Sequence, residues 1–211
     1  MKQYVDPLGD LRSLYEMRKV PIRSRLQEFS NVPPSAYFYE LVYCLLTPQS
    51  SAVNADKAVQ SLRSVQFQER GGDPESFLRN PTHYIRFHKT KSRHLLLARE
   101  SFQTIARAIT DATESSELRD WLVMNVLGLG YKEATHFLRN IGKNGGLAIL
   151  DRHILRNLKR HNVIRTIPES LSKKKYLTIE KQFMKFSVRI GIPLDELDLL
   201  FWSMETGEIR K

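Results

Sequence analysis

Apolar residues recur along the chain at intervals of three and four, the spacing that places side chains on one face of an α-helix. The pattern is strong in segments 6–29 and 91–110. In the second segment its members are Leu95, Ala98, Phe102, Ile105 and Ile109. No alternation of apolar and polar residues is long enough to form a sheet. The sequence therefore predicts an all-α fold.

Prolines and small polar residues mark the expected helix ends. Pro21 should interrupt or kink the first helix, and Pro48 should end the apolar helix 36–46. Ser50 or Ser51 can cap the helix that follows, and 71–74 reads as a loop. The other expected elements are short pieces around Phe77 and Tyr84, a helix from Ser115 or Ser116, and helices over 132–141, 151–161, 172–190 and 193–204.

A Gly-x-Gly turn between two helices, at Gly128 and Gly130, is the most informative motif. Glycine adopts positive φ at little steric cost and lets another molecule approach the backbone closely. The first N–H groups of the second helix lack intrahelical partners, so they can bind a phosphate. These are the properties of a helix-hairpin-helix DNA clamp, here spanning 126–141. An ordinary turn between packed helices is the alternative.

Two ionisable residues add chemistry to this turn. Lys132 lies at the start of the second helix, where the positive end of the helix dipole favours a neutral, nucleophilic amine. Asp151 lies nineteen residues further on, directly before a helix that it can cap. The simpler roles are a solvated or DNA-facing lysine and a capping aspartate.

Charge points to nucleic acid. The net charge of +10 and the pI near 9.8 suit a phosphate backbone, although a solvated basic surface is the alternative. Ten basic residues lie between positions 139 and 175 against only two acidic ones. They are Arg139, Lys143, Arg152, Arg156, Lys159, Arg160, Arg165, Lys173, Lys174 and Lys175.

The remaining composition excludes several classes of site. With Cys44 as its one cysteine, the chain can form no internal disulfide, cysteine-ligated zinc site or iron–sulfur cluster. The histidines show no spacing that suits a metal ion, so no metal site is expected. No signal-peptide run or membrane span is evident. We therefore expect an intracellular protein without a membrane partner.

Segment 126–155 resembles the helix-hairpin-helix plus aspartate signature of the superfamily that contains endonuclease III and the 8-oxoguanine DNA glycosylases. Segments 45–52, 86–93 and 198–211 are also similar, and the last is most like the compact type-2 8-oxoguanine glycosylases of archaea and some bacteria. The chain departs from the eukaryotic-type enzymes in lacking an N-terminal β domain. It departs from endonuclease III in lacking the cysteines.

The resemblance implies a role for each matched residue. Lys132 and Asp151 match the catalytic pair of the bifunctional members. The implied contacts to an extruded base come from Phe87, Asp198, Trp202 and the terminal Lys211, with hydrophobic core as the alternative for the two aromatic residues. The implied DNA contacts come from Gln49, which would fill the gap left by the base, and from Gly128, Gly130 and Arg152. Backbone carbonyls at Leu127 and Leu129 would hold a structural monovalent cation, and no other cofactor is required.

The expected function is a glycosylase and abasic-site lyase that removes 8-oxoguanine from damaged double-stranded DNA. Lys132 would attack the anomeric carbon of the sugar to form a Schiff base, and β-elimination would follow. Alternatives are a related enzyme for another lesion such as an oxidised pyrimidine, a non-catalytic helix-hairpin-helix DNA-binding module, and a basic helical RNA-binding protein.

The expected architecture has two helical lobes with the active-site cleft between them. One lobe comprises 1–50 and 147–211, and the other comprises 51–146. We expect a monomer in the cytoplasm of a prokaryote, associated with the nucleoid.

Overall fold

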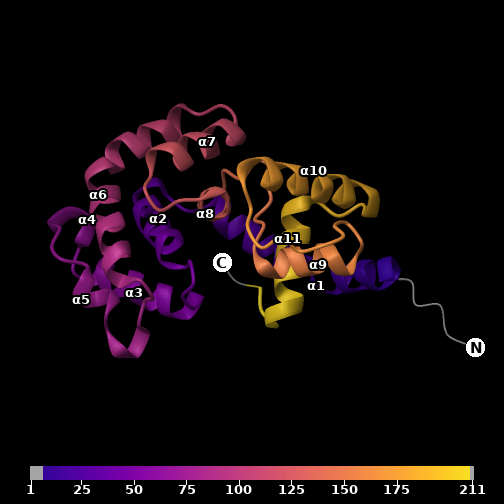
Figure 1. Cartoon of the computed structure of the whole chain (residues 1–211), viewed down its shortest axis with the longest axis horizontal. Helices are drawn as coiled ribbons and strands as arrows, with labels where there is room; N and C mark the ends of the chain where they lie inside the picture. Colours follow the sequence, from indigo (N-terminus) through magenta and orange to yellow (C-terminus); the bar gives the residue numbers. More distant parts are fainter. Residues whose placement is uncertain (1–6, 210–211) are drawn as a thin grey trace, which may run out of the picture. The chain divides into compact units, whose positions relative to one another are not determined.

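The computed structural model describes residues 7–209 and contains α-helices and two short 3₁₀ helices, with no strand in that range (Figure 1). The all-α prediction is confirmed. The α-helices are α1 (Pro7–Ser30), α2 (Tyr37–Leu46), α3 (Ala52–Ser64), α4 (Phe67–Arg70), α5 (Glu75–Leu78), α6 (His88–Asp111), α7 (Ser115–Asn125), α8 (Tyr131–Asn140), α9 (Arg152–Arg160), α10 (Lys173–Ile190) and α11 (Leu194–Thr206). The 3₁₀ helices are η1 (Pro34–Ala36) and η2 (Pro81–His83).

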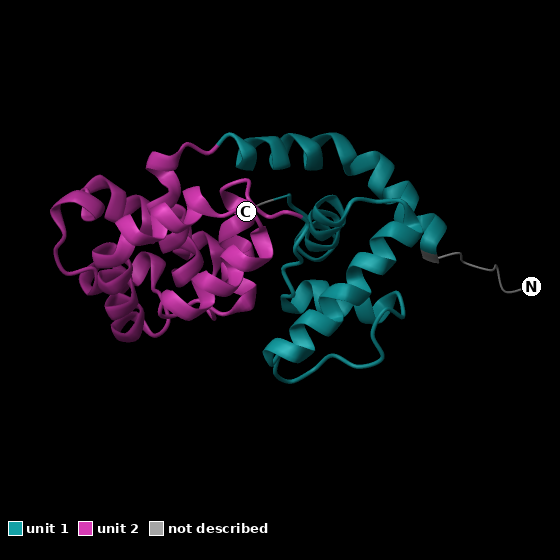
Figure 2. Cartoon of the chain, turned by 90° about the horizontal axis from the view of Figure 1, so that it is seen from above, with its two compact units in different colours: residues 1–31, 146–211 teal, residues 32–145 magenta. Residues whose placement is uncertain are grey.

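The chain folds as two compact units, shown in different colours in Figure 2. Unit 1 comprises 1–31 and 146–211, and unit 2 is the uninterrupted segment 32–145. The first boundary lies after Asn31 and not after residue 50, the position expected from the sequence. Helix α2 thus belongs to unit 2.

The burial of α2 explains this boundary. Every residue of the helix after Tyr37 is buried, and the helix packs against α3, α6 and α8 within unit 2. Even its one acidic side chain is satisfied inside the unit, because Asn140 Nδ2 donates to Glu40 Oε2 over 3.1 Å. A helix that is apolar on all sides must be covered by its neighbours, so α2 forms the centre of unit 2.

Unit 1 joins the two ends of the described chain through helices α1 and α11, which pack together. Tyr15 Oη donates to Glu196 Oε2 over 2.6 Å, and Arg23 Nε lies 3.0 Å from the same carboxylate oxygen. Arg18 adds a bond of 2.8 Å to Ser203 Oγ. The polar contacts between α1 and α11 accompany a buried seam that includes Leu11 and Ile22.

Three local predictions differ from the structure. Helix α1 continues through Pro21, so the expected interruption is wrong, and the expected kink stays a prediction. The helical piece expected around Tyr84 lies earlier, at η2, and Tyr84 itself is extended. Helix α4 was not predicted.

Candidate active site

The turn between α7 and α8 closes as its glycines predict. Leu129 N donates to Val126 O over 3.2 Å, and Gly128 occupies the third position with φ of +95°. A turn of this kind requires positive φ there, which an L-residue rarely adopts. Gly130 then forms the N-cap of α8, and both glycines are exposed. The first N–H groups of α8 are therefore presented beside a bare backbone, the arrangement a phosphate needs.

His94 of α6 lies directly against this turn. A β-carbon added to Gly128 would lie 2.3 Å from His94 Nδ1, so glycine is required by close approach as well as by its φ angle. Burial of the imidazole, together with the charges of Arg93 and Lys91, lowers the pKa of His94. The neutral ring thus packs beneath the hairpin.

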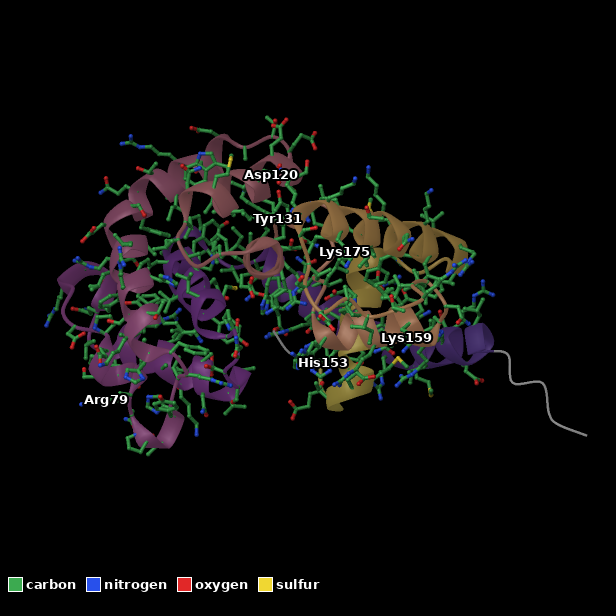
Figure 3. The ribbon with its side chains drawn as sticks, viewed as in Figure 1. Arg79, Asp120, Tyr131, His153, Lys159 and Lys175 are labelled. Atoms are coloured by element: carbon green, nitrogen blue, oxygen red, sulfur yellow. The ribbon has the colours of Figure 1, made fainter. Side chains whose placement is uncertain are left out.

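Helix α7 fixes the start of α8. Tyr131 Oη donates to Asp120 Oδ1 over 2.6 Å, and these two side chains are labelled in Figure 3. The guanidinium of the buried Arg119 lies 5.1 Å from the centre of the Tyr131 ring. Tyr131 directly precedes Lys132, so these contacts hold the first turn of α8 in place.

Lys132 lies in that first turn and is accessible, with its side chain 26% exposed. Its ammonium nitrogen lies 3.6 Å from Glu133 Oε1. Sequence reasoning did not single out Glu133, although its position directly after Lys132 was a visible signal. The carboxylate provides a counter-charge for the lysine next to the exposed hairpin.

Asp151 is the N-cap of α9, and its Oδ1 accepts a hydrogen bond of 2.8 Å from Ile154 N. The capping role expected from sequence is confirmed. Asp151 belongs to unit 1, whereas Lys132 belongs to unit 2. One carboxylate oxygen is occupied by the cap, which leaves the second for other chemistry.

Gln49 and Phe87 share an unusual backbone conformation. Gln49 is exposed with φ of +55°, and Phe87, the N-cap of α6, has φ of +60°. The Phe87 side chain is 49% exposed, so the hydrophobic-core alternative is wrong for this residue. The Arg86 guanidinium lies 5.0 Å from the centre of its ring. Both residues are presented from loops of unit 2.

Asp198 and Trp202 are one turn apart on α11, so their side chains share a face of the helix. Asp198 is buried, and Trp202 is partly exposed with its ring 6.2 Å from that of His153 in an edge-on contact. Lys211 lies outside the described residues.

The basic residues between 139 and 175 do not form one uniform surface. Arg139 is buried within unit 2, which removes it from any DNA-facing set. Arg156 and Arg160 lie 3.9 and 3.3 Å from the carboxylate of Glu205, which partly neutralises them. Arg152, Lys159 and Lys175 are exposed, and the last two are labelled in Figure 3.

No group of three or more histidine, cysteine, aspartate or glutamate side chains is arranged to hold a metal ion in residues 7–209. In the same part of the chain, no helix is long and apolar enough to cross a membrane.

Known proteins match this chain along most of its length. The chain is 37% identical to an 8-oxoguanine DNA glycosylase/AP lyase of Fusobacterium nucleatum, over 96% of this chain and 97% of that protein. The Methanocaldococcus jannaschii protein of the same name is 36% identical over 90% of this chain and 91% of its own length.

Solved structures of 8-oxoguanine DNA glycosylases also superpose on this chain. The 8-oxoguanine DNA glycosylase of Thermotoga maritima superposes with a TM-score of 0.84 at 30% identity, covering 97% of this chain and 98% of that one. A crystal structure of the Methanocaldococcus jannaschii enzyme in complex with a 15mer DNA containing 8-oxoguanine gives 0.84 at 32% identity, covering 95% and 99%. The sequence profile of the 8-oxoguanine DNA glycosylase family matches residues 22–192. On this evidence the chain belongs to the 8-oxoguanine DNA glycosylase family.

Proposed function

We propose that this protein excises 8-oxoguanine from duplex DNA and cleaves the resulting abasic site, with Lys132 as the nucleophile. The observation that carries the assignment is a lysine in the first turn of α8, directly after an exposed glycine hairpin, in a chain that matches glycosylase/lyases over most of its length. The oxidised-pyrimidine, hairpin-module and RNA-binding alternatives lack this support.

The reaction begins with base flipping, because the glycosidic bond is inaccessible inside the duplex. The hairpin N–H groups hold the phosphate backbone, and Gln49 fills the vacated space. Phe87 and Trp202 stack on the extruded base, while Asp198 and Lys211 contact its edge. Arg152 binds a phosphate. An exposed ring and a partly exposed ring suit stacking better than core packing.

Once deprotonated, the amine of Lys132 attacks C1′ of the deoxyribose. The C1′–N9 bond breaks, and its electron pair leaves with the base, which takes up a proton. The carboxylate of Asp151 stabilises positive charge developing on the sugar or accepts a proton. The sugar ring then opens: the C1′–O4′ bond breaks, its electron pair stays on O4′, which takes up a proton, and the nitrogen of Lys132 forms a protonated Schiff base with C1′. Loss of a C2′ proton then expels the 3′ phosphate and nicks the strand.

Borohydride trapping tests the nucleophile. Reduction of the Schiff base on an 8-oxoguanine duplex should give a stable covalent adduct with the wild type, and Lys132→Ala should abolish it. Lys185→Ala, which removes an exposed lysine of α10, is the matched control and should trap normally. Abundant adduct from Lys132→Ala would refute the assignment.

Asp151→Asn separates chemistry from capping. Asparagine is as good an N-cap as aspartate, so the helix should persist and the melting temperature should change little. Excision should nevertheless fall by on the order of a hundredfold, because the carboxylate charge is lost. Equal activity of the two proteins would reduce Asp151 to a cap.

We further propose a structural monovalent cation on the carbonyls of Leu127 and Leu129. Leu127 and Gly128 are exposed, so the turn lies at the surface, whereas Leu129 is buried. DNA affinity should then differ between potassium and tetramethylammonium salts at equal ionic strength.

We also propose that the protein is a monomer that acts at the nucleoid in a prokaryotic cytoplasm. Sedimentation tests the monomer, and fluorescence localisation tests the place of action.

A further inference from the structure

Lys91, in the first turn of α6, is a buried lysine with 5% of its surface exposed. Its ammonium donates to Leu46 O over 2.7 Å, to Pro48 O over 2.6 Å and to Ser50 Oγ over 3.2 Å. A buried charge is costly unless it is hydrogen-bonded, and here three acceptors offset that cost. Two of them precede Gln49 and the third follows it, so the ammonium holds the Gln49 loop from both sides.

Ser50 extends this attachment to a second loop. Its hydroxyl oxygen also accepts a hydrogen bond of 3.0 Å from Arg86 N, directly before Phe87. Asn54 Nδ2 adds a bond of 3.1 Å to Tyr84 O in the same loop. The Gln49 loop and the 84–87 loop are therefore tied together, and Lys91 contacts their common point at Ser50.

Both loops need such support. Gln49 and Phe87 each have positive φ, which costs a residue other than glycine about 1 kcal/mol or more and persists only when the surroundings hold it. The Lys91 backbone also takes part, since its N–H donates to Phe87 O over 2.9 Å. The side chain of Lys91 thus holds the first loop, and its backbone holds the second.

We infer that Lys91 is a positioning residue for base extrusion: through Ser50 it keeps Gln49 and Phe87 in register, so that gap filling and base stacking occur together. The inference rests on the proposed function, because the roles of Gln49 and Phe87 do. Lys91 is not itself a nucleophile, since its amine is buried and its hydrogens are committed to the loop.

The inference predicts a selective defect. Removing a base from 8-oxoguanine DNA requires both the gap-filling and the stacking side chain, whereas an abasic site has no base to extrude or to stack. Lys91→Met removes all three N–H donors and shortens the side chain by only one atom. Single-turnover excision of 8-oxoguanine should fall about 30-fold, since displacement of positioning groups by an ångström has effects of this order. Borohydride trapping on a preformed abasic duplex should change by less than about threefold.

Lys57→Met, at an exposed position of α3, should leave both activities unchanged. Equal losses of excision and trapping in Lys91→Met would reduce Lys91 to a stabilising role, and no loss of either would also overturn the inference. A wild type that neither excises nor traps would instead refute the proposed function, so the two failures are distinguishable.

A second variant keeps the test independent of folding. Ser50→Ala leaves the ammonium its two carbonyl acceptors and removes the one oxygen that accepts from both Lys91 and Arg86 N, while the bond from Asn54 to Tyr84 remains. It should show the same selective loss of excision, about fivefold, with little change in melting temperature. If Lys91→Met fails to fold, Ser50→Ala decides alone, and unchanged excision would contradict the inference.

Discussion

Folding changes the ionisation of Lys91. Burial, joined by the charge of Lys132 and opposed by that of Glu133, lowers the pKa of its ammonium from 10.5 to about 8. The unfolded chain therefore binds more protons than the folded chain between these two values. Stability must then rise with pH through this window, and the full desolvation cost applies below it.

The increase in stability with pH that is due to Lys91 can be measured directly. The free energy of unfolding of the wild type, relative to Lys91→Met, should increase by on the order of 1 kcal/mol between pH 7.5 and 9.5. Urea denaturation at both pH values gives the difference in free energy of unfolding between the two proteins at each pH. The contributions of the other titrating groups cancel in that difference. A difference independent of pH would show that the ammonium keeps its ordinary acidity.

At the scale of elements, the hairpin between α7 and α8 is fixed by α6. His94 lies where a side chain on Gly128 would be, so substitution at this glycine combines backbone strain with a steric clash. Gly72 offers a comparison, since it has φ of +111° and no atom lies within 4 Å of an added β-carbon. Substitution at Gly72 measures the cost of backbone strain alone, and substitution at Gly128 measures that cost together with the clash against His94.

Gly128→Ala should lose about 2 to 4 kcal/mol of stability, and Gly72→Ala only about 1 kcal/mol. Denaturant titration of both variants provides the measurement. Adding His94→Ala to Gly128→Ala should recover part of the deficit, because the clash is relieved. If the second substitution recovers nothing, the contact with His94 is not the source of the cost.

The same elements show how far sequence reasoning extends. Helical periodicity and the glycines near Lys132 predicted α6, α8 and the turn, because these signals are local. The boundary at residue 31 was missed, since the contacts that assign α2 to unit 2 come from α6 and α8 far along the chain. The role of Lys91 was not predicted, because its hydrogen-bond acceptors lie more than forty residues away in sequence.

At the scale of the whole molecule, charge governs the encounter with DNA. The chain carries +10, and several basic side chains of unit 1 are exposed. Binding should release counterions from the duplex, so affinity must fall steeply with salt. Specific recognition of the lesion adds to this electrostatic contribution to the affinity and does not replace it.

Affinity for a duplex with a stable abasic analogue should therefore drop on the order of a hundredfold or more between 50 and 200 mM salt. Fluorescence anisotropy over a salt series gives the slope. Lys175→Ala should make the slope shallower by about one if this exposed lysine meets a phosphate. Affinity that does not respond to salt would contradict an electrostatic encounter.

The pairing of α1 with α11 has a consequence for biosynthesis. Unit 2 is complete once residue 145 has left the ribosome, whereas α1 must wait for a partner that begins at Leu194. At about 5 to 20 residues per second, the first helix spends on the order of ten seconds or more without the surface that buries Leu11 and Ile22. During translation we therefore expect chaperones to bind α1. Unit 2, which carries Lys132, can already be folded at that time.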